Sequence, residues 1–246
     1  MKFAIAGATG QLGKQVTDAA RAAGHDTVAL SRATGIDLMT GDGLSDALRG
    51  ADAVIDVSAT SSTKTRDAIR FFGTATSNLL AAEREAGVPH HVAISIIGAA
   101  PINANYYAGK KVQEDLLLER SDGWSLLRTT QFHGFVRQII PAGKVGPLQL
   151  VPTMRSQPVS AAEVATELVA IAVGGPVGIA PDLAGPHEEN MADMVRRYLA
   201  VQGEKRKVLQ MPLPGAWGRG MRSGALLPKP GTRLGSQTFD AWLAQQ

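Results

Sequence analysis

Two tyrosines and two lysines stand at helical spacing near the middle of the chain, in Tyr106-Tyr107-Ala108-Gly109-Lys110-Lys111. Tyr106 and Lys110 are four residues apart, as are Tyr107 and Lys111, so each pair would share one face of a helix. A phenol beside an ammonium group has its pKa lowered from about 10 toward a value that suits proton transfer. Such a pair can protonate a carbonyl oxygen while the lysine also holds a ribose. Because Tyr-x-x-x-Lys also arises by chance on surface helices, its meaning depends on the elements around it.

The start of the chain predicts a strand, a glycine-rich turn and a helix. Residues 2–6 are mostly apolar and lead into GATGQLG at 7–13, after which a helical pattern runs to Ala23. Gly7 permits the tight turn, Gly10 lets the backbone approach a pyrophosphate, and Gly13 lets helix and strand pack closely. The N–H groups that open the helix favour phosphate charge. We therefore expect a dinucleotide site formed by Gly7, Thr9, Gly10, Gln11, Leu12 and Gly13. The alternative is an ordinary turn, since the spacing is one residue wider at the front than the usual fingerprint.

The residues that follow the second strand, expected over 26–30, indicate which dinucleotide is bound. An NAD site usually has an acidic residue at that edge for the ribose hydroxyls, whereas this chain has Ser31-Arg32. An arginine there suits a 2′-phosphate, so NADP(H) is favoured over NAD(H). The alternative is that Arg32 is a solvated loop residue.

Two further segments are expected to line the cofactor. Residues 35–38 predict a short third strand and its exit, where Asp37 would accept a hydrogen bond from the adenine amino group and Leu38 would pack on the ring. The apolar run 53–57 predicts a parallel strand buried on both faces. Its exit, Ser58-Ala59-Thr60, should lie along the cofactor because ligands of open α/β sheets bind beyond the carboxyl ends of the strands.

The rest of the chain alternates helices and strands before its pattern changes. Helices are expected over 65–86, 106–119, 160–172 and from 187 to 201, and strands over 91–97, 124–128, 148–151 and 157–159. His90 and His91 are interpreted as structural. Thr130, Gln131, Phe132 and His133 follow a strand and are expected to form the wall of a substrate pocket, although His133 could equally be a hydrogen-bonded core residue. We expect one domain, 1–246, in which residues from about 141 to 246 supply a substrate lobe.

Composition excludes several classes of protein. The chain has 246 residues, 44% apolar and 19% charged, and a net charge of +3, which does not indicate nucleic-acid binding. It contains no cysteine, so disulfides and zinc–thiolate sites are impossible, and no set of metal ligands is recognisable. No signal-peptide pattern and no apolar run of about 18 residues is present, so we expect a cytoplasmic protein without a membrane partner. Nothing in the sequence indicates the oligomeric state.

Seven segments together carry a resemblance that covers essentially the whole chain. They are GATGQLG at 7–13, Ser31-Arg32, VAISIIGA at 92–99, YYAGKKVQEDLL at 106–117, LLRTTQFHGF at 126–135, QPVSAAEVA at 157–165 and DLAGP at 182–186. In these the chain resembles the atypical short-chain dehydrogenases/reductases of the NmrA-like, NAD(P)H-binding kind. The resemblance implies a Rossmann-type, doubly wound α/β fold with a mostly parallel sheet and a small C-terminal lobe.

The resemblance also selects site residues. It favours Tyr106 and Lys110 over Tyr107 and Lys111, with Lys110 also a cofactor ligand. Ser95 matches the serine that orients a substrate carbonyl, although its spacing of eleven residues from Tyr106 is slightly short.

Three functions follow from these features. The leading hypothesis is an NADP(H)-dependent oxidoreductase that reduces a small carbonyl or quinone, with Tyr106 as the proton donor. The second is a non-catalytic NADP(H) sensor, because the family resembled includes such proteins. The third is an enzyme like the nucleotide-sugar epimerases and dehydratases. Fold alone does not decide among them.

Overall fold

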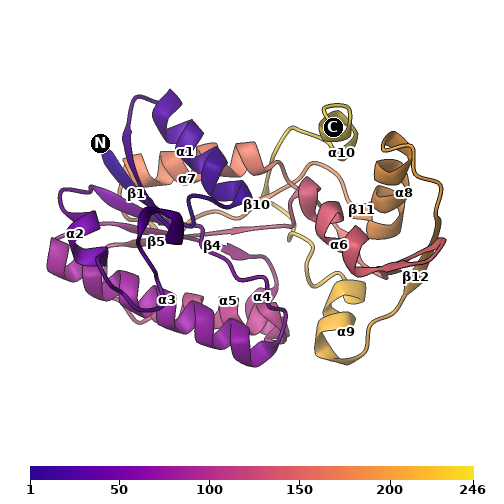
Figure 1. Ribbon diagram of the computed structural model, residues 1–246, viewed down its shortest axis with the longest axis horizontal. Helices are drawn as coiled ribbons and strands as arrows, with labels where there is room; N and C mark the ends of the chain where they lie inside the picture. Colours follow the sequence, from indigo (N-terminus) through magenta and orange to yellow (C-terminus); the bar gives the residue numbers. More distant parts are fainter. The chain divides into compact units, whose positions relative to one another are not determined.

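The computed structural model describes residues 1–246 and divides into two compact units (Figure 1). The first unit comprises Met1–Ser95, Asn103–Arg128 and Ala161–Pro181. The second comprises Ile96–Ile102, Thr129–Ser160 and Asp182–Gln246.

A mostly parallel sheet forms the centre of the first unit. Its strands are β1 (Lys2–Ala6), β2 (Asp26–Leu30), β3 (Ala53–Asp56), β4 (His91–Ile96), β5 (Trp124–Thr129) and β9 (Gly178–Ile179). They lie in the order β5-β4-β3-β1-β2, and β9 pairs with β5. The pairs β1–β2, β1–β3, β3–β4 and β5–β9 are all parallel. All carboxyl ends of the paired strands β1, β2 and β3 therefore meet at one edge, which is where such sheets bind ligands.

Helices cover both faces of this sheet. They are α1 (Gln11–Ala22), the 3₁₀ helix η1 (Arg32–Thr34), α2 (Leu44–Leu48), α3 (Thr65–Ala86), α5 (Tyr106–Leu118) and α7 (Ala161–Gly174). In Figure 1, α1 and α7 lie side by side on one face and α3 and α5 on the other. Strand β3 is buried along its whole length, as its continuous apolar run predicted. The core beside α3 is built mainly from aliphatic side chains, among them Leu30, Leu44, Leu48, Val54 and Leu79.

A glycine sets how closely α3 and α5 approach. A Cβ atom added at Gly109 would lie 2.5 Å from Phe72 Cδ2 and 2.6 Å from the Ala68 carbonyl oxygen, and the second of these is backbone. We expect Gly109→Ala to lower the free energy of unfolding by about 1–3 kcal/mol, as overpacking does, in urea denaturation. The matched control is Gly73→Ala, whose Cβ atom would be at ordinary contact, 3.4 Å from Val112 Cγ1. Equal stability of the two variants would contradict this packing argument.

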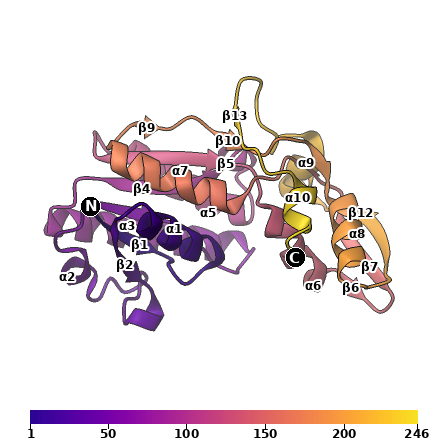
Figure 2. The ribbon, with the colours of Figure 1, turned by 90° about the horizontal axis from the view of Figure 1, so that it is seen from above.

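The second unit contains shorter elements. Its helices are α4 (Ala99–Ile102), the 3₁₀ helix η2 (His133–Phe135), α6 (Val136–Ala142), α8 (Met191–Val201), α9 (Gly215–Ser223) and α10 (Phe239–Leu243). Its strands are β6 (Lys144–Val145), β7 (Leu148–Pro152), β8 (Arg155–Ser156), β10 (Leu183–Ala184), β11 (Glu189–Asn190), β12 (Lys207–Met211) and β13 (Arg233–Leu234). Strands β12, β7 and β6 form a small sheet with β7 in the middle, against which α8 packs (Figure 2).

The predicted α/β class with a mostly parallel sheet is confirmed. The strand expected over 35–38 is wrong, because these residues form a turn. Gly35 has a left-handed backbone with φ +80°, and the Asp37 carboxylate accepts a hydrogen bond from the Met39 N–H at 2.8 Å. Elements α9, α10, β12 and β13 were not anticipated from the sequence. None of the helices combines the length and the apolarity needed to cross a bilayer.

Candidate functional site

The loop between β1 and α1 has the geometry of a phosphate cradle. Gly7 has φ +80°, and a Cβ atom there would lie 2.8 Å from Ser58 Cα. At Gly13 a Cβ atom would lie 2.1 Å from the Gly7 carbonyl oxygen, so helix and loop touch through backbone. Gly10 is the N-cap residue of α1, and no side chain caps the helix. Its first N–H groups are therefore free to bind an anion.

A pocket of about 490 Å³ opens beside this loop. Its wall is supplied by the segments that follow β1, β2 and β3, as expected for a ligand site at strand ends. Ten of the expected cofactor residues line it: Gly7, Thr9, Gly10, Ser31, Arg32, Asp37, Leu38, Ser58, Ala59 and Thr60. Gln11, Leu12, Gly13 and Lys110 do not. Six lining residues had not been singled out: Leu30, Ile36, Met39, Val57, Ser61 and Phe71. Most of these six could have been predicted, because they are neighbours in sequence of the residues that were.

The turn after β2 presents Arg32 to this pocket. The Thr34 hydroxyl lies 2.8 Å from the carbonyl oxygens of both Ala29 and Ser31, which share its single hydrogen, and it accepts from the Ser31 N–H at 3.2 Å. This network fixes the 3₁₀ turn that carries Arg32. The guanidinium itself is exposed and makes no hydrogen bond or ion pair within the protein. An unpaired arginine on this turn is suited to bind a phosphate.

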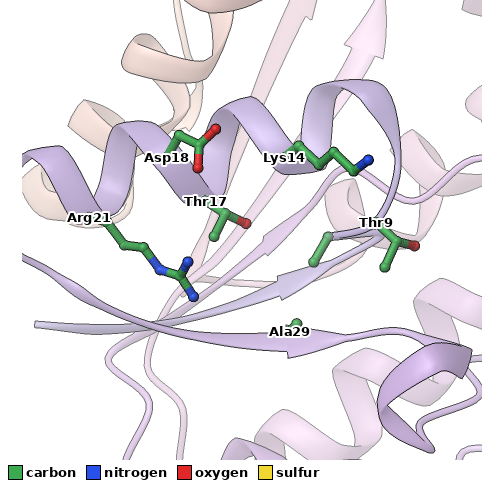
Figure 3. A pocket seen from close by; sticks show the side chains of 7 residues that line it. Thr9, Lys14, Thr17, Asp18, Arg21 and Ala29 are labelled. Atoms are coloured by element: carbon green, nitrogen blue, oxygen red, sulfur yellow. The ribbon is translucent and has the colours of Figure 1, made fainter.

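A smaller pocket of about 280 Å³ lies between α1 and β2. Lys14, Thr17, Asp18 and Arg21 of α1 line it, and Figure 3 shows Thr17 and Arg21 pointing toward Ala29 of β2. Thr9 lines both pockets. Arg21 donates from Nε to the Thr27 hydroxyl at 3.0 Å, so its guanidinium is partly engaged.

Lys110 points into the protein interior. Its side chain is 3% exposed, and Nζ donates to the Ile94 carbonyl oxygen at 2.9 Å and to Gln113 Oε1 at 2.8 Å. The ring centroid of Phe72 lies 4.3 Å from Nζ. Burial lowers the pKa of Lys110 to about 8, although the charges of Asp56 and Glu114 act to raise it. The lysine is therefore largely an ammonium at neutral pH.

Tyr106 does not have the lowered pKa that its spacing from Lys110 predicted, so that expectation is wrong. Burial raises the pKa of the phenol, and the negative charge of Asp56 raises it further. The ring stands edge to face with Phe72, 5.3 Å between centroids. The Lys110 ammonium is hydrogen-bonded to other oxygens, and the charges that shift the pKa of Tyr106 are those of Asp56 and Tyr107.

Two buried serine hydroxyl groups of the first unit have no hydrogen-bond partner in the protein. Ser95, near the end of β4, is fully buried, and its Oγ makes no hydrogen bond. The Oγ of Ser58, in the wall of the larger pocket, is also buried and unpartnered. Such groups are costly unless a ligand or water satisfies them. Both are therefore candidates for contact with a bound molecule.

The histidines before β4 make hydrogen bonds in the interior, in agreement with a structural role. His90 Nε2 lies 2.8 Å from Ser125 Oγ, and burial lowers the pKa of His90. His91 Nδ1 lies 2.5 Å from Glu83 Oε1. Burial alone would lower the pKa of His91, but the Glu83 carboxylate outweighs it and the pKa is raised.

The residues expected to contact substrate, Thr130 to His133, belong to the second unit. Within it the Thr130 hydroxyl donates to the Gln157 carbonyl oxygen at 2.6 Å, and Ser156 Oγ lies 3.4 Å from Gln131 Oε1. His133 is buried, with Nε2 at 3.0 Å from the Gln237 carbonyl oxygen. Phe132 lines neither pocket described above, nor do the other three. Their role in substrate binding stays a prediction.

Comparison with models of protein families shows to which family the chain belongs. Residues 7–173 match the model of a family described as NAD(P)H-binding. The chain belongs to the NAD(P)H-binding family. The cofactor class predicted from the glycine loop is thereby confirmed, while the preference of this NAD(P)H-binding protein for NADP stays a prediction. The glycine cradle, the uncapped start of α1 and the unpartnered Ser58 hydroxyl all fit a dinucleotide.

Solved structures of similar fold are distant in sequence. An NADPH-dependent quinone oxidoreductase from Escherichia coli, solved with NADPH, has a TM-score of 0.73 and 17% identity, with 99% of each chain covered. A nucleoside-diphosphate-sugar epimerase from Staphylococcus aureus has a TM-score of 0.72 and 15% identity, again with 99% of each chain covered. A short-chain dehydrogenase/reductase superfamily protein from Agrobacterium tumefaciens, solved with NAD, has a TM-score of 0.69 and 18% identity over 100% and 95% of the two chains. No curated protein matches this NAD(P)H-binding chain in sequence. These likenesses confirm the predicted Rossmann-type fold.

Proposed function

We propose that this NAD(P)H-binding protein is an NADP(H)-dependent oxidoreductase that reduces a small carbonyl or quinone compound. The observation that carries the proposal is the pocket at the ends of β1, β2 and β3, where an uncapped helix start and the unpaired Arg32 guanidinium meet. The first suits a pyrophosphate and the second a 2′-phosphate. A reduced nicotinamide bound to this unit supplies a hydride equivalent. The quinone oxidoreductase of similar fold supports this class of reaction.

We assign the chemical roles to three residues of the first unit. Tyr106 keeps its proton throughout the neutral range because its pKa is raised, so the phenol is available as the acid. Lys110 uses two of its three N–H donors on Ile94 and Gln113, and we assign the third to a ribose hydroxyl. The unpartnered hydroxyl of Ser95 is assigned to the substrate oxygen. Gly7, Thr9, Gly10, Gln11, Leu12 and Gly13 bind the pyrophosphate in this proposal.

The preference for NADP(H) depends on Arg32. We expect Arg32→Glu to weaken NADPH binding by about 10- to 100-fold, because a charge-assisted hydrogen bond to the 2′-phosphate is replaced by repulsion. NADH affinity should not fall, since NADH lacks that phosphate and an acidic residue at this edge suits its ribose hydroxyls. Titration calorimetry with both cofactors measures the two affinities. The control is Arg21→Glu, which reverses an exposed charge in the smaller pocket and should leave both unchanged. Unaltered NADPH affinity in Arg32→Glu would remove that residue from the site.

The reaction itself is tested by the absorbance of the reduced nicotinamide. Protein saturated with NADPH is mixed with a panel of quinones and aldehydes, and oxidation by at least one of them is expected. Isomerisation of a nucleotide sugar by protein loaded with the oxidised cofactor, with no net reduction of that cofactor, would instead support an epimerase, the activity named for the Staphylococcus aureus protein of similar fold.

A non-catalytic sensor is the second candidate, and one observation favours it. Because the pKa of Tyr106 is raised, its phenol is a weaker acid than the one that the sequence predicted. Tight NADPH binding without oxidation by any member of the panel would support the sensor.

A further inference from the structure

A row of buried polar groups continues from Lys110 into the sheet. Lys110 Nζ donates to Gln113 Oε1, and Gln113 Nε2 donates in turn to Asp56 Oδ2, each at 2.8 Å. Asp56 and Gln113 are fully buried and Lys110 is 3% exposed. The row joins α5 to the end of β3, and all its members belong to the first unit. Hydrogen bonds so shielded from water are strong and directional.

The chemistry of these three side chains determines which group donates and which accepts in each hydrogen bond of the row. An ionised carboxylate can only accept hydrogen bonds, so Asp56 requires the amide NH₂ of Gln113. The amide oxygen must then face Lys110, and an oxygen can only accept. Lys110 therefore meets an acceptor, which suits an ammonium with three donors. A reversed amide would turn its NH₂ toward the ammonium and leave two donors opposed.

The second oxygen of the same carboxylate reaches the wall of the larger pocket. Asp56 Oδ1 accepts from the Ser58 N–H at 2.9 Å. Ser58 lines that pocket, and the Gly7 loop packs on its backbone. One buried carboxylate thus holds both the cofactor-lining segment after β3 and the residue that orients Lys110.

We propose that Asp56 and Gln113 are positioning residues that keep Lys110 oriented and charged as an ammonium. The consequence for catalysis rests on the function proposed above, whereas the effect on Lys110 does not. Other groups also face this region. Glu114, which is paired with Arg128 at 2.6 Å, and Tyr106 lie on the same helix, and Phe72 faces Lys110 from α3. His91 on β4 and its partner Glu83 on α3 form the neighbouring buried ionic pair.

The test is a direct titration of Lys110 by ¹⁵N NMR of the side-chain amines, which needs neither cofactor nor turnover. The wild-type midpoint is expected at about 8. Asp56→Asn removes the charge and lets the Gln113 amide reverse, while the oxygen of the introduced amide can still accept from the Ser58 N–H. We expect the midpoint to fall by about one pH unit or more, as the loss of a nearby opposite charge does. NADPH affinity should change little, because the pocket wall keeps its hydrogen bond.

Two further variants test whether Asp56 acts on the pKa of Lys110 through Gln113 or only through its negative charge. Gln113→Met removes the link and should also lower the midpoint, and it carries the test if Asp56→Asn fails to fold. In the double variant the two shifts of the Lys110 midpoint should not add, because the two residues act through one path.

Asp115→Asn is the matched control, since this carboxylate lies on α5 but pairs with Lys111 at the surface, and it should leave the titration midpoint of Lys110 unchanged. A midpoint in Asp56→Asn or Gln113→Met equal to that of the wild type, or fully additive effects, would overturn the proposal. Should the protein prove a reductase, the alkaline limb of its pH–rate profile should move with the NMR midpoint.

Discussion

Gly13→Ala should weaken NADPH binding by about 100-fold or more, which corresponds to about 3 kcal/mol. The added Cβ atom would lie 2.1 Å from the Gly7 carbonyl oxygen and 2.7 Å from Ala8 Cα. Both atoms are backbone, so no side chain can rotate away, and the loop or α1 must move. That movement displaces the N–H groups that receive the pyrophosphate in our proposal. Calorimetric titration with NADPH measures the loss, and urea denaturation should show lower stability.

A matched substitution separates this steric effect from the chemistry of alanine. Gly174 is the last residue of α7, and a Cβ atom there would meet nothing within 4 Å. Gly174→Ala should therefore bind NADPH like the wild type and be as stable or slightly more so. If Gly13→Ala also kept full affinity, the glycine loop would not be the phosphate site.

Lys110→Met should lower turnover by about 100-fold or more, in the range of other acid–base groups. Methionine keeps most of the volume beside Phe72 but cannot donate to a ribose or support a proton transfer. Because Lys110 does not line the larger pocket, NADPH affinity should fall much less than turnover. Steady-state kinetics with the best acceptor of the panel, together with calorimetry, separates the two quantities.

The neighbouring lysine provides the control. Lys111 is partly exposed and pairs with Asp115 at 2.5 Å, so Lys111→Met should keep wild-type turnover. In the wild type, turnover should fall as the pH rises through about 8, because the Lys110 ammonium is lost there. Full activity of Lys110→Met would exclude the lysine from the mechanism.

Sequence patterns predicted the first unit well because its local and long-range signals agree. The apolar run of β3 predicts a buried strand, the glycines before α1 predict a strand-to-helix turn, and the period of α3 predicts a long helix. All three agree with one α/β fold. The turn at residues 35–38 was misread as a strand, since Asp37 bonds locally to Met39 and β2 is the last strand of its side of the sheet. Elements α9 and β12 belong to the C-terminal part of the chain, which is rich in glycine and proline and was interpreted only as a lobe.

The candidate site was predicted only in part. Gly7 and Arg32 were singled out from their positions after the first two strands, and both line the larger pocket. The state of Lys110 could not be derived, because it depends on its burial and on Asp56, which is distant in sequence and reaches Lys110 through Gln113 on the same helix. The pKa of Tyr106 was wrongly expected to be lowered for a similar reason. It is raised by burial and by the Asp56 carboxylate of β3, neither of which can be seen in the sequence around Tyr106.

The most direct test of the central claim follows the hydride. NADPH carrying two deuterium atoms at C4 of the nicotinamide is incubated with the protein and an aldehyde acceptor of the panel, and the product is analysed by mass spectrometry. The account predicts an alcohol with deuterium on the former carbonyl carbon, formed at a rate that falls in Lys110→Met. Tight NADPH binding with no deuterated alcohol from any aldehyde, and no oxidation by any quinone, would contradict it.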